Sequence, residues 1–203
     1  FKPLYFKQQI REDIGIPDNS FVVGSFQKDG IGWGSGDKPK LVKGPDLLLS
    51  SLQKLKCISP RPLFVLLTGP SRGYVKKGLE YLGIPYSHSY LSSSDDLPPY
   101  YSALDVYAVT SRDEGGPKAI LEAMACGIPI VSTNVGQAPD LIHNGLNGFL
   151  CESDPFSVSS ALASIQSLDN QPLIENGLIT AKKYHFTSNQ LAWNKLFTHL
   201  HSL

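Results

Sequence analysis

Residues 105–136 constrain the fold of this chain more than any other stretch. They begin with an apolar, β-branched run, DVYAVT, which predicts a strand, continue with PKAILEAMA, which has helix-forming composition, and end with a second predicted strand, IPIVST. Gly116 and Pro117 suit the N-cap and first position of the helix, and Gly127 suits the residue just past its end. A strand, a helix and a second strand in this order predict a βαβ unit in a parallel sheet.

Two glutamates lie on either side of the predicted start of this helix. Glu114 precedes the helix, and Glu122 lies about 7.5 Å along the axis from Pro117 at about 1.5 Å per residue. Between them, unpaired N–H groups and the positive end of the helix dipole favour an anion at the carboxyl edge of the sheet. Two carboxylates beside an anion site indicate a ligand with hydroxyls on both sides of its phosphates, and a nucleoside diphosphate sugar has this layout.

Each glutamate also has an explanation without a ligand. Glu114 fits an acid that is simply placed favourably near a helix N-terminus. Glu122 is the only charged residue in AILEAMACGIPIV, and on so apolar a helix it will be buried unless it faces a cleft or a partner. A structural ion pair with a lysine is therefore the alternative to a ligand contact.

The spacing of these glutamates, within EGGPKAILEAMACGIPIVST, closely resembles the signature of the family 4 retaining glycosyltransferases, glycosyl transferases group 1, which have the two-domain GT-B architecture. The resemblance covers most of the chain, because other segments are similar to successive landmarks of that family's C-terminal, donor-binding domain: FVVGSFQKD, LVKGPDLLL, FVLLTGP, YYSALDVYAVTS and NVGQAPDLIHNGLNGFL. It implies an α/β fold with a Rossmann-like, doubly wound parallel sheet, one half of a GT-B enzyme.

The resemblance also implies a domain organisation. Residues 1–203 would form a single nucleotide-sugar-binding domain, in which residues 1–18 follow an interdomain linker. The helix over 186–203 would pack on a missing N-terminal domain that carries the acceptor site. Because the chain does not begin with Met, we expect it to be part of a longer protein.

The family pattern implies a set of donor-binding residues. Lys28 and Lys43 would hold the diphosphate, Glu122 the ribose, and Glu114 with the loop amides the transferred sugar. Lys28 stands where many members have arginine, and both lysines also fit ordinary solvated side chains. The full predicted donor-binding set is Lys28, Lys43, Tyr90, Leu91, Glu114, Gly115, Gly116, Lys118 and Glu122, of which Glu114, Lys28 and Lys43 would act in catalysis.

The chemistry implied is transfer of a hexosyl group from a nucleoside diphosphate sugar, with retained configuration, to a glycan or lipid-linked acceptor. We expect no cofactor besides the donor and no metal, since the chain contains no Asp-x-Asp pair. A nucleotide-sugar epimerase of the same architecture, or a non-catalytic sugar-nucleotide-binding module, remains an alternative. Conversion of a free nucleotide sugar would support the epimerase, and loss of the charged positions would support the non-catalytic module.

The composition also bears on nucleic-acid binding, on the state of the cysteines and on membrane insertion. A net charge of zero, from 18 basic and 18 acidic side chains, leaves no electrostatic footprint for nucleic acid. Three cysteines without metal-ligand spacing are typical of free thiols in the cytoplasm. No apolar run approaches the roughly 20 residues that span a bilayer, so any membrane contact is expected to be peripheral and through the missing half.

Two further expectations concern the loops after the first two predicted strands. Residues 29–40, DGIGWGSGDKPK, hold four glycines and a proline and predict a flexible surface loop without a dinucleotide-binding fingerprint. Arg72, in the next loop, is expected either to approach a phosphate or to lie on the surface.

Overall fold

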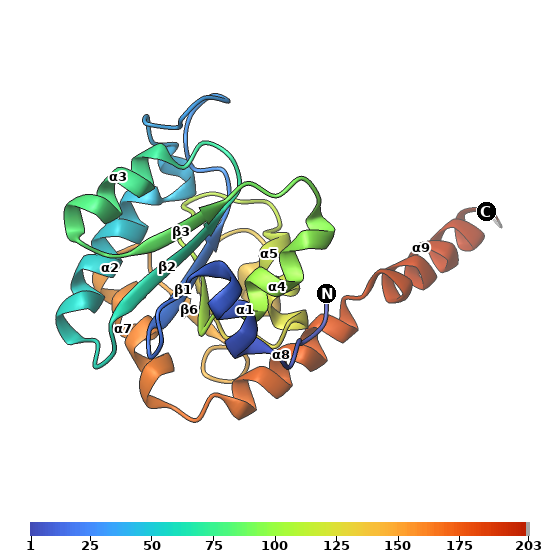
Figure 1. The fold of residues 1–203 in the computed structure, drawn as a ribbon. Coiled ribbons are helices and arrows are strands. Elements are labelled where there is room, and N and C mark those ends of the chain that lie inside the picture. Colours follow the sequence, from blue (N-terminus) through green and yellow to red (C-terminus); the bar gives the residue numbers. More distant parts are fainter. Residues whose placement is uncertain (202–203) are drawn as a thin grey trace.

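The computed structural model describes residues 1–201, and within the last helix it describes only the side chains of Thr187, Gln190 and residues 193–199. Six parallel strands of this described chain form one sheet in the order β3-β2-β1-β4-β5-β6 (Figure 1). The strands are β1 (Phe21–Phe26), β2 (Leu63–Thr68), β3 (Tyr86–Ser89), β4 (Val106–Val109), β5 (Ile130–Thr133) and β6 (Phe149–Cys151). This order is that of a Rossmann-like sheet, so the predicted fold class is confirmed.

Helices cover both faces of the sheet because successive strand residues point to opposite sides. Val23, Val65 and their neighbours pack against α2 (Pro45–Ile58), α3 (Gly73–Leu82) and α7 (Pro155–Ser167). Val22 and Leu66 face the opposite layer, formed by α1 (Lys7–Ile14), α4 (Leu97–Ser102), α5 (Lys118–Ala125) and α6 (Ala138–Leu141). Figure 1 shows α2 and α3 on one side of the sheet and α4 and α5 on the other. The sheet is therefore doubly wound, as predicted.

Helix boundaries follow the glycine and proline positions closely. Pro45 occupies the first turn of α2, and Gly127, with φ +73°, follows the end of α5. The start of α5 differs from the prediction by one residue: Pro117 has an extended ψ of 93° and is the N-cap, so the helix begins at Lys118. Since proline fixes φ but not ψ, its presence marks the helix start only to within a residue.

The glycine-rich connection between β1 and α2, at the top of Figure 1, has the predicted surface position, because residues 31–35 are exposed, but its backbone is also hydrogen-bonded to the start of α3. Gly73 N–H donates to the Ser35 carbonyl at 2.7 Å, and Tyr74 N–H donates to the Gly36 carbonyl at 2.9 Å. A Cβ at Gly36 would lie 2.1 Å from the Ser71 carbonyl oxygen, so only glycine permits this approach. The glycines here serve close packing of one backbone on another.

Arg72 is buried, so both expectations for it are wrong. Its guanidinium lies 3.0 Å from the Asp29 carboxylate, and both side chains are inaccessible to solvent. It also donates to the carbonyls of Ser25, at 2.5 Å, and Thr68, at 2.8 Å. Because Thr68 is the last residue of β2 and Ser25 is the second-last of β1, Arg72 links the carboxyl ends of the two strands.

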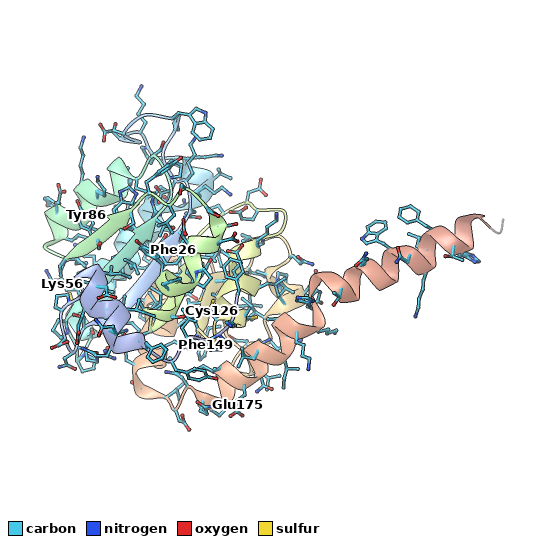
Figure 2. All side chains as sticks on the ribbon, turned by 45° about the vertical axis from the view of Figure 1, so that its right-hand side comes forward. Phe26, Lys56, Tyr86, Cys126, Phe149 and Glu175 are labelled. Carbon is cyan, nitrogen blue, oxygen red and sulfur yellow. The ribbon has the colours of Figure 1, made fainter. Side chains whose placement is uncertain are left out.

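The two ends of the chain behave differently. Near the N-terminus, α1 is held to the connection between α4 and β4, since Lys7 donates to the Leu104 carbonyl at 2.6 Å and Arg11 to the Ala103 carbonyl at 2.8 Å. After α8 (Gln171–Lys183), α9 (Phe186–His201) projects away from the body of the domain (Figures 1 and 2). Residues 202 and 203 of the predicted C-terminal helix lie outside the described residues. Within the described part, no helix has the length and apolar character to cross a membrane.

Candidate active site

The candidate site lies near the point in the sheet where the strand order reverses direction. β1 and β4 are adjacent and parallel, but the chain proceeds outward from β1 to β2 and β3, and from β4 to β5 and β6. In such sheets ligands bind beyond the carboxyl ends of the strands at this switch point. The loops there carry Gln27 and Lys28 after β1, and residues 110–117 after β4.

A groove of about 360 Å³ lies beside this switch point, beyond the carboxyl ends of β1, β2 and β3, and α4 and α5 also contribute to its walls. Lys28, Leu91 and Glu122 from the predicted set line it, together with Gln27 and Tyr101. Phe26 and Glu122, both in its walls, are 96 positions apart in the chain and are brought together by the parallel topology. One predicted cation, Lys28, and one predicted carboxylate, Glu122, therefore line the same groove.

Glu122 is half-buried and is held by a tyrosine rather than a lysine. Tyr101 donates its hydroxyl to Glu122 Oε2 at 2.9 Å. Burial, reinforced by the neighbouring Tyr107 and by Glu122, raises the pKa of Tyr101, so this hydroxyl remains a donor. No ion pair of Glu122 is present among the described residues, which removes the support for a structural pair with lysine.

Glu114 and Lys43 form the second part of the site. Lys43 Nζ lies 2.5 Å from Glu114 Oε1, and the Ser111 hydroxyl donates to the same oxygen at 3.0 Å. The side chains are 23% and 17% exposed respectively, so the ion pair is partly shielded from water. These two residues lie outside the walls of the 360 Å³ groove.

Backbone contacts explain why Lys43 reaches Glu114 across 71 positions of sequence. Lys43 ends η1 (Leu41–Lys43), and Gly44 follows it with φ +62°. A Cβ at Gly44 would lie 1.7 Å from the Thr110 carbonyl oxygen, and the Thr110 hydroxyl donates to the Gly44 carbonyl at 3.0 Å. Arg112 adds a bidentate contact to Asp46, at 2.8 and 2.7 Å. The start of α2 is thereby bound to the loop after β4.

The loop between Glu114 and α5 is exposed, and its backbone packs against the loop that follows β5. Gln137 N–H donates to the Gly115 carbonyl at 3.0 Å, and a Cβ at Gly136 would lie 2.2 Å from the Glu114 carbonyl oxygen. Gly115, Gly116 and Lys118 are all exposed at this N-terminus. The loop after β5 therefore fixes the backbone that carries the predicted sugar contacts.

The remaining predicted residues lie near the groove with different exposure. Leu91 lines the groove, whereas Tyr90 is 72% exposed and lies outside its walls. The Lys28 ammonium lies 3.5 Å from the centroid of the Trp33 ring. A base contact by the backbone near Tyr90 and Leu91 stays a prediction.

Sequence reasoning missed Ser111 and Tyr101, the hydrogen-bond donors to the two glutamates. Ser111 had a usable signal, because it lies two positions after the end of β4 and precedes Glu114 by three positions. Tyr101 lies in an apolar stretch that predicts core packing, and it is indeed buried; its hydroxyl contact depends on how α4 and α5 lie together.

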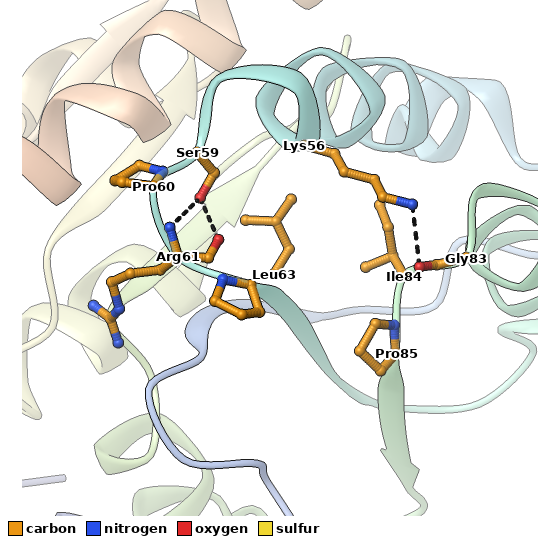
Figure 3. A pocket seen from close by; sticks show the side chains of 9 residues that line it. Lys56, Ser59, Pro60, Arg61, Leu63, Gly83, Ile84 and Pro85 are labelled. Carbon is orange, nitrogen blue, oxygen red and sulfur yellow. Dashed lines mark hydrogen bonds between the residues drawn. The ribbon is translucent and has the colours of Figure 1, made fainter.

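A larger pocket of about 420 Å³ lies near the amino ends of β2 and β3 (Figure 3). Its polar groups are already bonded: Lys56 Nζ donates to the Leu82 carbonyl at 2.6 Å, and the Ser59 hydroxyl donates to the Arg61 carbonyl at 2.6 Å. Pro60, Pro62 and Pro85 also contribute to its walls. This edge of a parallel sheet is opposite to the ligand-binding edge, so we do not assign a donor site here.

Among the residues that the structure describes, no group of three or more His, Cys, Asp or Glu side chains is placed to hold a metal ion. Metal independence stays a prediction that rests on the family resemblance. The cysteines are free thiols in the structure, Cys126 and Cys151 buried and Cys57 exposed. Burial raises the pKa of Cys126 and of Cys151 to about 11, so neither is an activated nucleophile.

Comparison with known protein families decides which family the chain belongs to. The family model of glycosyl transferases group 1 matches residues 39–183, which include both glutamates and Lys43. This chain belongs to that family. A D-inositol 3-phosphate glycosyltransferase of Corynebacterium jeikeium is 30% identical over 207 aligned positions, covering 95% of this chain and 47% of that protein. The chain thus spans about half the length of this relative.

Solved structures agree with the fold. HepE of Anabaena, crystallised in complex with UDP, superposes with a TM-score of 0.76 at 25% identity, covering 95% of this chain and 52% of that one. The C-terminal domain of the glycosyl transferase group 1 protein LpcC from Francisella tularensis gives a TM-score of 0.72 at 20% identity, covering 91% of this chain and 95% of that one. This member of the glycosyl transferases group 1 family thus has a fold that matches one half of a GT-B enzyme.

Proposed function

We propose that this chain is the donor-binding half of a retaining glycosyltransferase that takes a hexosyl group from a nucleoside diphosphate sugar. The observation that carries the proposal is the groove beyond the carboxyl ends of β1, β2 and β3, which has Lys28 and Glu122 in its walls. A cation and a carboxylate in one groove match a phosphate and a ribose. The proposal is supported by the relative HepE, which has been crystallised with UDP and with UDP-glucose.

In this proposal Glu122 accepts hydrogen bonds from the ribose hydroxyls. Its Oε2 is oriented by Tyr101, and Oε1 has no partner among the described residues. Lys28 and Lys43 bind the diphosphate, together with the unpaired N–H groups at the start of α5. Lysines and helix ends neutralise the departing diphosphate by preorganised charge, which is the reason to propose transfer without a metal.

Glu114 positions the transferred sugar, with the exposed amides of Gly115 and Gly116 beside it. The ion pair of Glu114 with Lys43 supports this arrangement, because it places the sugar-binding carboxylate beside a cation proposed for the diphosphate. The bond that breaks in the transfer joins the sugar to that diphosphate. We assign no general base, and the departing phosphate is proposed to assist attack on the same face of the sugar, with retention.

Other roles follow from position. Lys118, exposed at the start of α5, is proposed to contact the donor, and the backbone near Tyr90 and Leu91 the base. The acceptor, a glycan or a lipid-linked sugar, is proposed to bind an N-terminal domain in the rest of the protein. α9, with Trp193 and Phe197 exposed, would pack on that domain. A cytoplasmic enzyme with a peripheral membrane contact through that other half is the corresponding proposal for location.

The transferase is favoured over the epimerase. The family model describes glycosyl transferases, and the corynebacterial relative is named as one. The non-catalytic alternative is disfavoured because the four proposed charges are all present and placed at one edge of the sheet.

The test is a thermal-shift titration of this chain with UDP, GDP and ADP and with their sugar conjugates. A ligand that binds only the folded state stabilises it by RT ln(1 + [L]/Kd), or about 2.7 kcal/mol at a hundredfold excess over Kd. We expect one nucleoside diphosphate to stabilise the chain and Lys28→Met or Lys43→Met to reduce the shift. Lys54→Met, on the exposed face of α2, is the matched control. Absence of stabilisation by all three nucleotides would contradict the proposal.

The catalytic part of the proposal is tested on a protein that contains both halves. We expect transfer to persist with excess EDTA. A strict requirement for Mg²⁺ or Mn²⁺ would contradict the metal-free mechanism, while leaving the donor-binding proposal intact.

A further inference from the structure

The contact between Lys28 and Trp33 is not explained by packing. The ammonium lies 3.5 Å from the ring centroid, although Trp33 is 84% exposed and contributes nothing to the core. In the part of the chain that the structure describes, Lys28 forms no ion pair with a carboxylate. The indole ring is therefore the group that restrains this cation at the groove.

The loop presents Trp33 in a defined position. Ser71 Oγ lies 3.1 Å from the carbonyl oxygens of Gly32 and Gly34, the residues on either side of Trp33, and shares its proton between them. Ser35, the next residue, accepts a hydrogen bond from Gly73 N–H at 2.7 Å. The backbone around the indole is thus fixed to the start of α3.

The contacts that fix the backbone around Trp33 are connected to the wall of the groove. Ser71 precedes the buried Arg72, whose guanidinium bonds the Thr68 carbonyl at 2.8 Å and pairs with Asp29, the residue after Lys28. Thr68 and Lys28 both line the groove. The indole and the groove wall are therefore held by one connected set of contacts, so the ring keeps its place relative to the groove.

An aromatic ring and a carboxylate restrain a lysine with different consequences. A carboxylate neutralises the charge, as Glu114 does for Lys43, whereas an indole face attracts the ammonium and leaves its positive charge in place. The ammonium has three N–H donors, and those directed away from the ring remain available for phosphate oxygens. Restraining the flexible lysine before binding also reduces the entropy that binding must remove.

We propose that Trp33 is a positioning residue for the donor, which holds the Lys28 ammonium at the groove so that it meets the diphosphate without first being ordered. The inference rests on the proposed function, because it takes Lys28 as a diphosphate contact. It adds a residue from the glycine-rich loop to the proposed donor site, and the role of that loop would be to position the Trp33 ring against Lys28.

The test is a double-mutant cycle with UDP as probe, or with GDP or ADP if the thermal-shift titration favours one of them. Dissociation constants are measured by calorimetry for the unsubstituted chain, Trp33→Leu, Lys28→Met and the double variant. We expect Trp33→Leu to weaken binding about two- to five-fold, the range of an exposed cation–π contact. In the Lys28→Met background the same substitution should have no effect. Trp33→Phe, which keeps a ring, should retain part of the affinity.

Controls separate this role from general damage. Trp193→Phe, on the projecting α9, should bind UDP like the unsubstituted chain, and it leaves Trp33 as the only tryptophan. In that background, tryptophan fluorescence should change when Lys28→Met is added without ligand and when UDP is added to the protein with Lys28.

The outcomes distinguish the two proposals. If no nucleoside diphosphate binds the unsubstituted chain, the proposed function fails and this inference falls with it. If UDP binds and Lys28→Met weakens it, but Trp33→Leu has no effect or weakens binding equally in both backgrounds, only the role of Trp33 is overturned. Tighter binding by Trp33→Leu would also overturn it, because the indole would then compete with the diphosphate.

Discussion

At the amino edge of the sheet, one carboxylate is surrounded by cations. Asp105 lies 2.9 Å from Lys7, 3.0 Å from Arg11 and 3.4 Å from Arg61, and accepts the Val22 N–H at 2.9 Å. Its partners come from α1, β1 and the turn before β2, so the cluster links separate parts of the chain. Both oxygens of Asp105 are used, and the side chain is only 16% exposed.

At the carboxyl edge the charges are more sparsely paired. Glu122 has one hydrogen-bond donor, Tyr101, and Lys28 faces an aromatic ring, in the described part of the chain. Glu114 and Lys43 pair with each other at a partly open position. Donors and acceptors therefore remain available at this edge for a ligand.

The comparison separates two uses of the same residue types. A carboxylate saturated by several cations and an amide has little left for a ligand and stabilises the fold, whereas the singly bonded charges near the switch point are the ones that we propose to bind the donor. The two edges are therefore expected to respond in opposite ways to substitution. Changes at the amino edge should alter stability, and changes at the carboxyl edge should alter affinity.

The largest effect is expected for Asp105→Ala. Removing this carboxylate leaves three cations near one another without their counter-ion, and partial exposure moderates the cost to about 2–4 kcal/mol of unfolding free energy. Urea denaturation measures the loss, and UDP affinity of the folded variant should be unchanged. The control is Asp13→Asn, whose carboxylate accepts only an exposed contact from Gln9 and should cost less than about 0.5 kcal/mol. A matching loss in both variants would contradict the structural role of the cluster.

Protonation of Asp105 should remove part of the same stability. Burial alone would raise the pKa of Asp105, but the charges of Lys7 and Arg11 and the bond from Val22 N–H outweigh it and hold the pKa below its ordinary value of 3.8. The folded protein thus binds fewer protons than the unfolded chain near this pH. The contribution of Asp105 is complete above 3.8 and is lost as the pH falls through the lower folded pKa.

Unfolding free energies of the chain and of Asp105→Asn, measured from neutral to acid pH, check this sign. The difference between them should be constant at higher pH and should shrink in acid. A difference that grows as the pH falls would show that Asp105 does not carry a depressed pKa.

At the carboxyl edge, Glu122→Ala should weaken UDP and its sugar conjugate alike, because both contain the ribose. Loss of a charge-assisted hydrogen bond predicts about 1.5–3 kcal/mol of binding free energy. Calorimetric titration measures both ligands, and circular dichroism checks folding. Tyr101→Phe is the companion variant, since it keeps the carboxylate but removes the one donor that Glu122 has among the described residues, and it should weaken binding less. An effect confined to the sugar conjugate would contradict the ribose assignment.

The elements and the edge of the sheet that carries the site are predictable from local patterns. Gly44 and Pro45 mark the start of α2, Gly127 marks the end of α5, and alternating strand and helix signals require a parallel sheet. That topology already places Lys28 and Glu114 after strands at one edge. Family spacing then identifies Glu122.

The pairings within the site are not predictable in this way, because they depend on contacts between distant segments. Lys43 meets Glu114 only because Gly44 can approach the Thr110 backbone. Arg72 is buried because Asp29 and two strand-end carbonyls happen to converge on it. The composition of these loops predicts polar, exposed segments, and nothing local signals that one backbone packs on the other.

The smallest effect is expected for Glu114→Gln. This variant best distinguishes the proposed sugar contact from the proposed diphosphate contact at the carboxyl edge. In the free protein Glu114 neutralises Lys43, so replacing the carboxylate by an amide frees the cation. Bare UDP should therefore bind unchanged or slightly tighter, by no more than about 1 kcal/mol for a partly exposed pair. The sugar conjugate should bind more weakly by about 0.5–1.5 kcal/mol, since only its sugar reaches the lost acceptor. Lys43→Met, in contrast, should weaken both ligands.

Comparing the two variants with both ligands locates the sugar without any turnover measurement. If Glu114→Gln and Lys43→Met weaken bare UDP equally, the two residues act as one structural pair and Glu114 has no sugar-specific role. If Glu114→Gln changes neither ligand, the pair lies outside the donor site, and the groove with Lys28 and Glu122 binds the donor alone. A loss confined to the sugar conjugate would place the transferred sugar beside Glu114 and the diphosphate between Lys43 and Lys28.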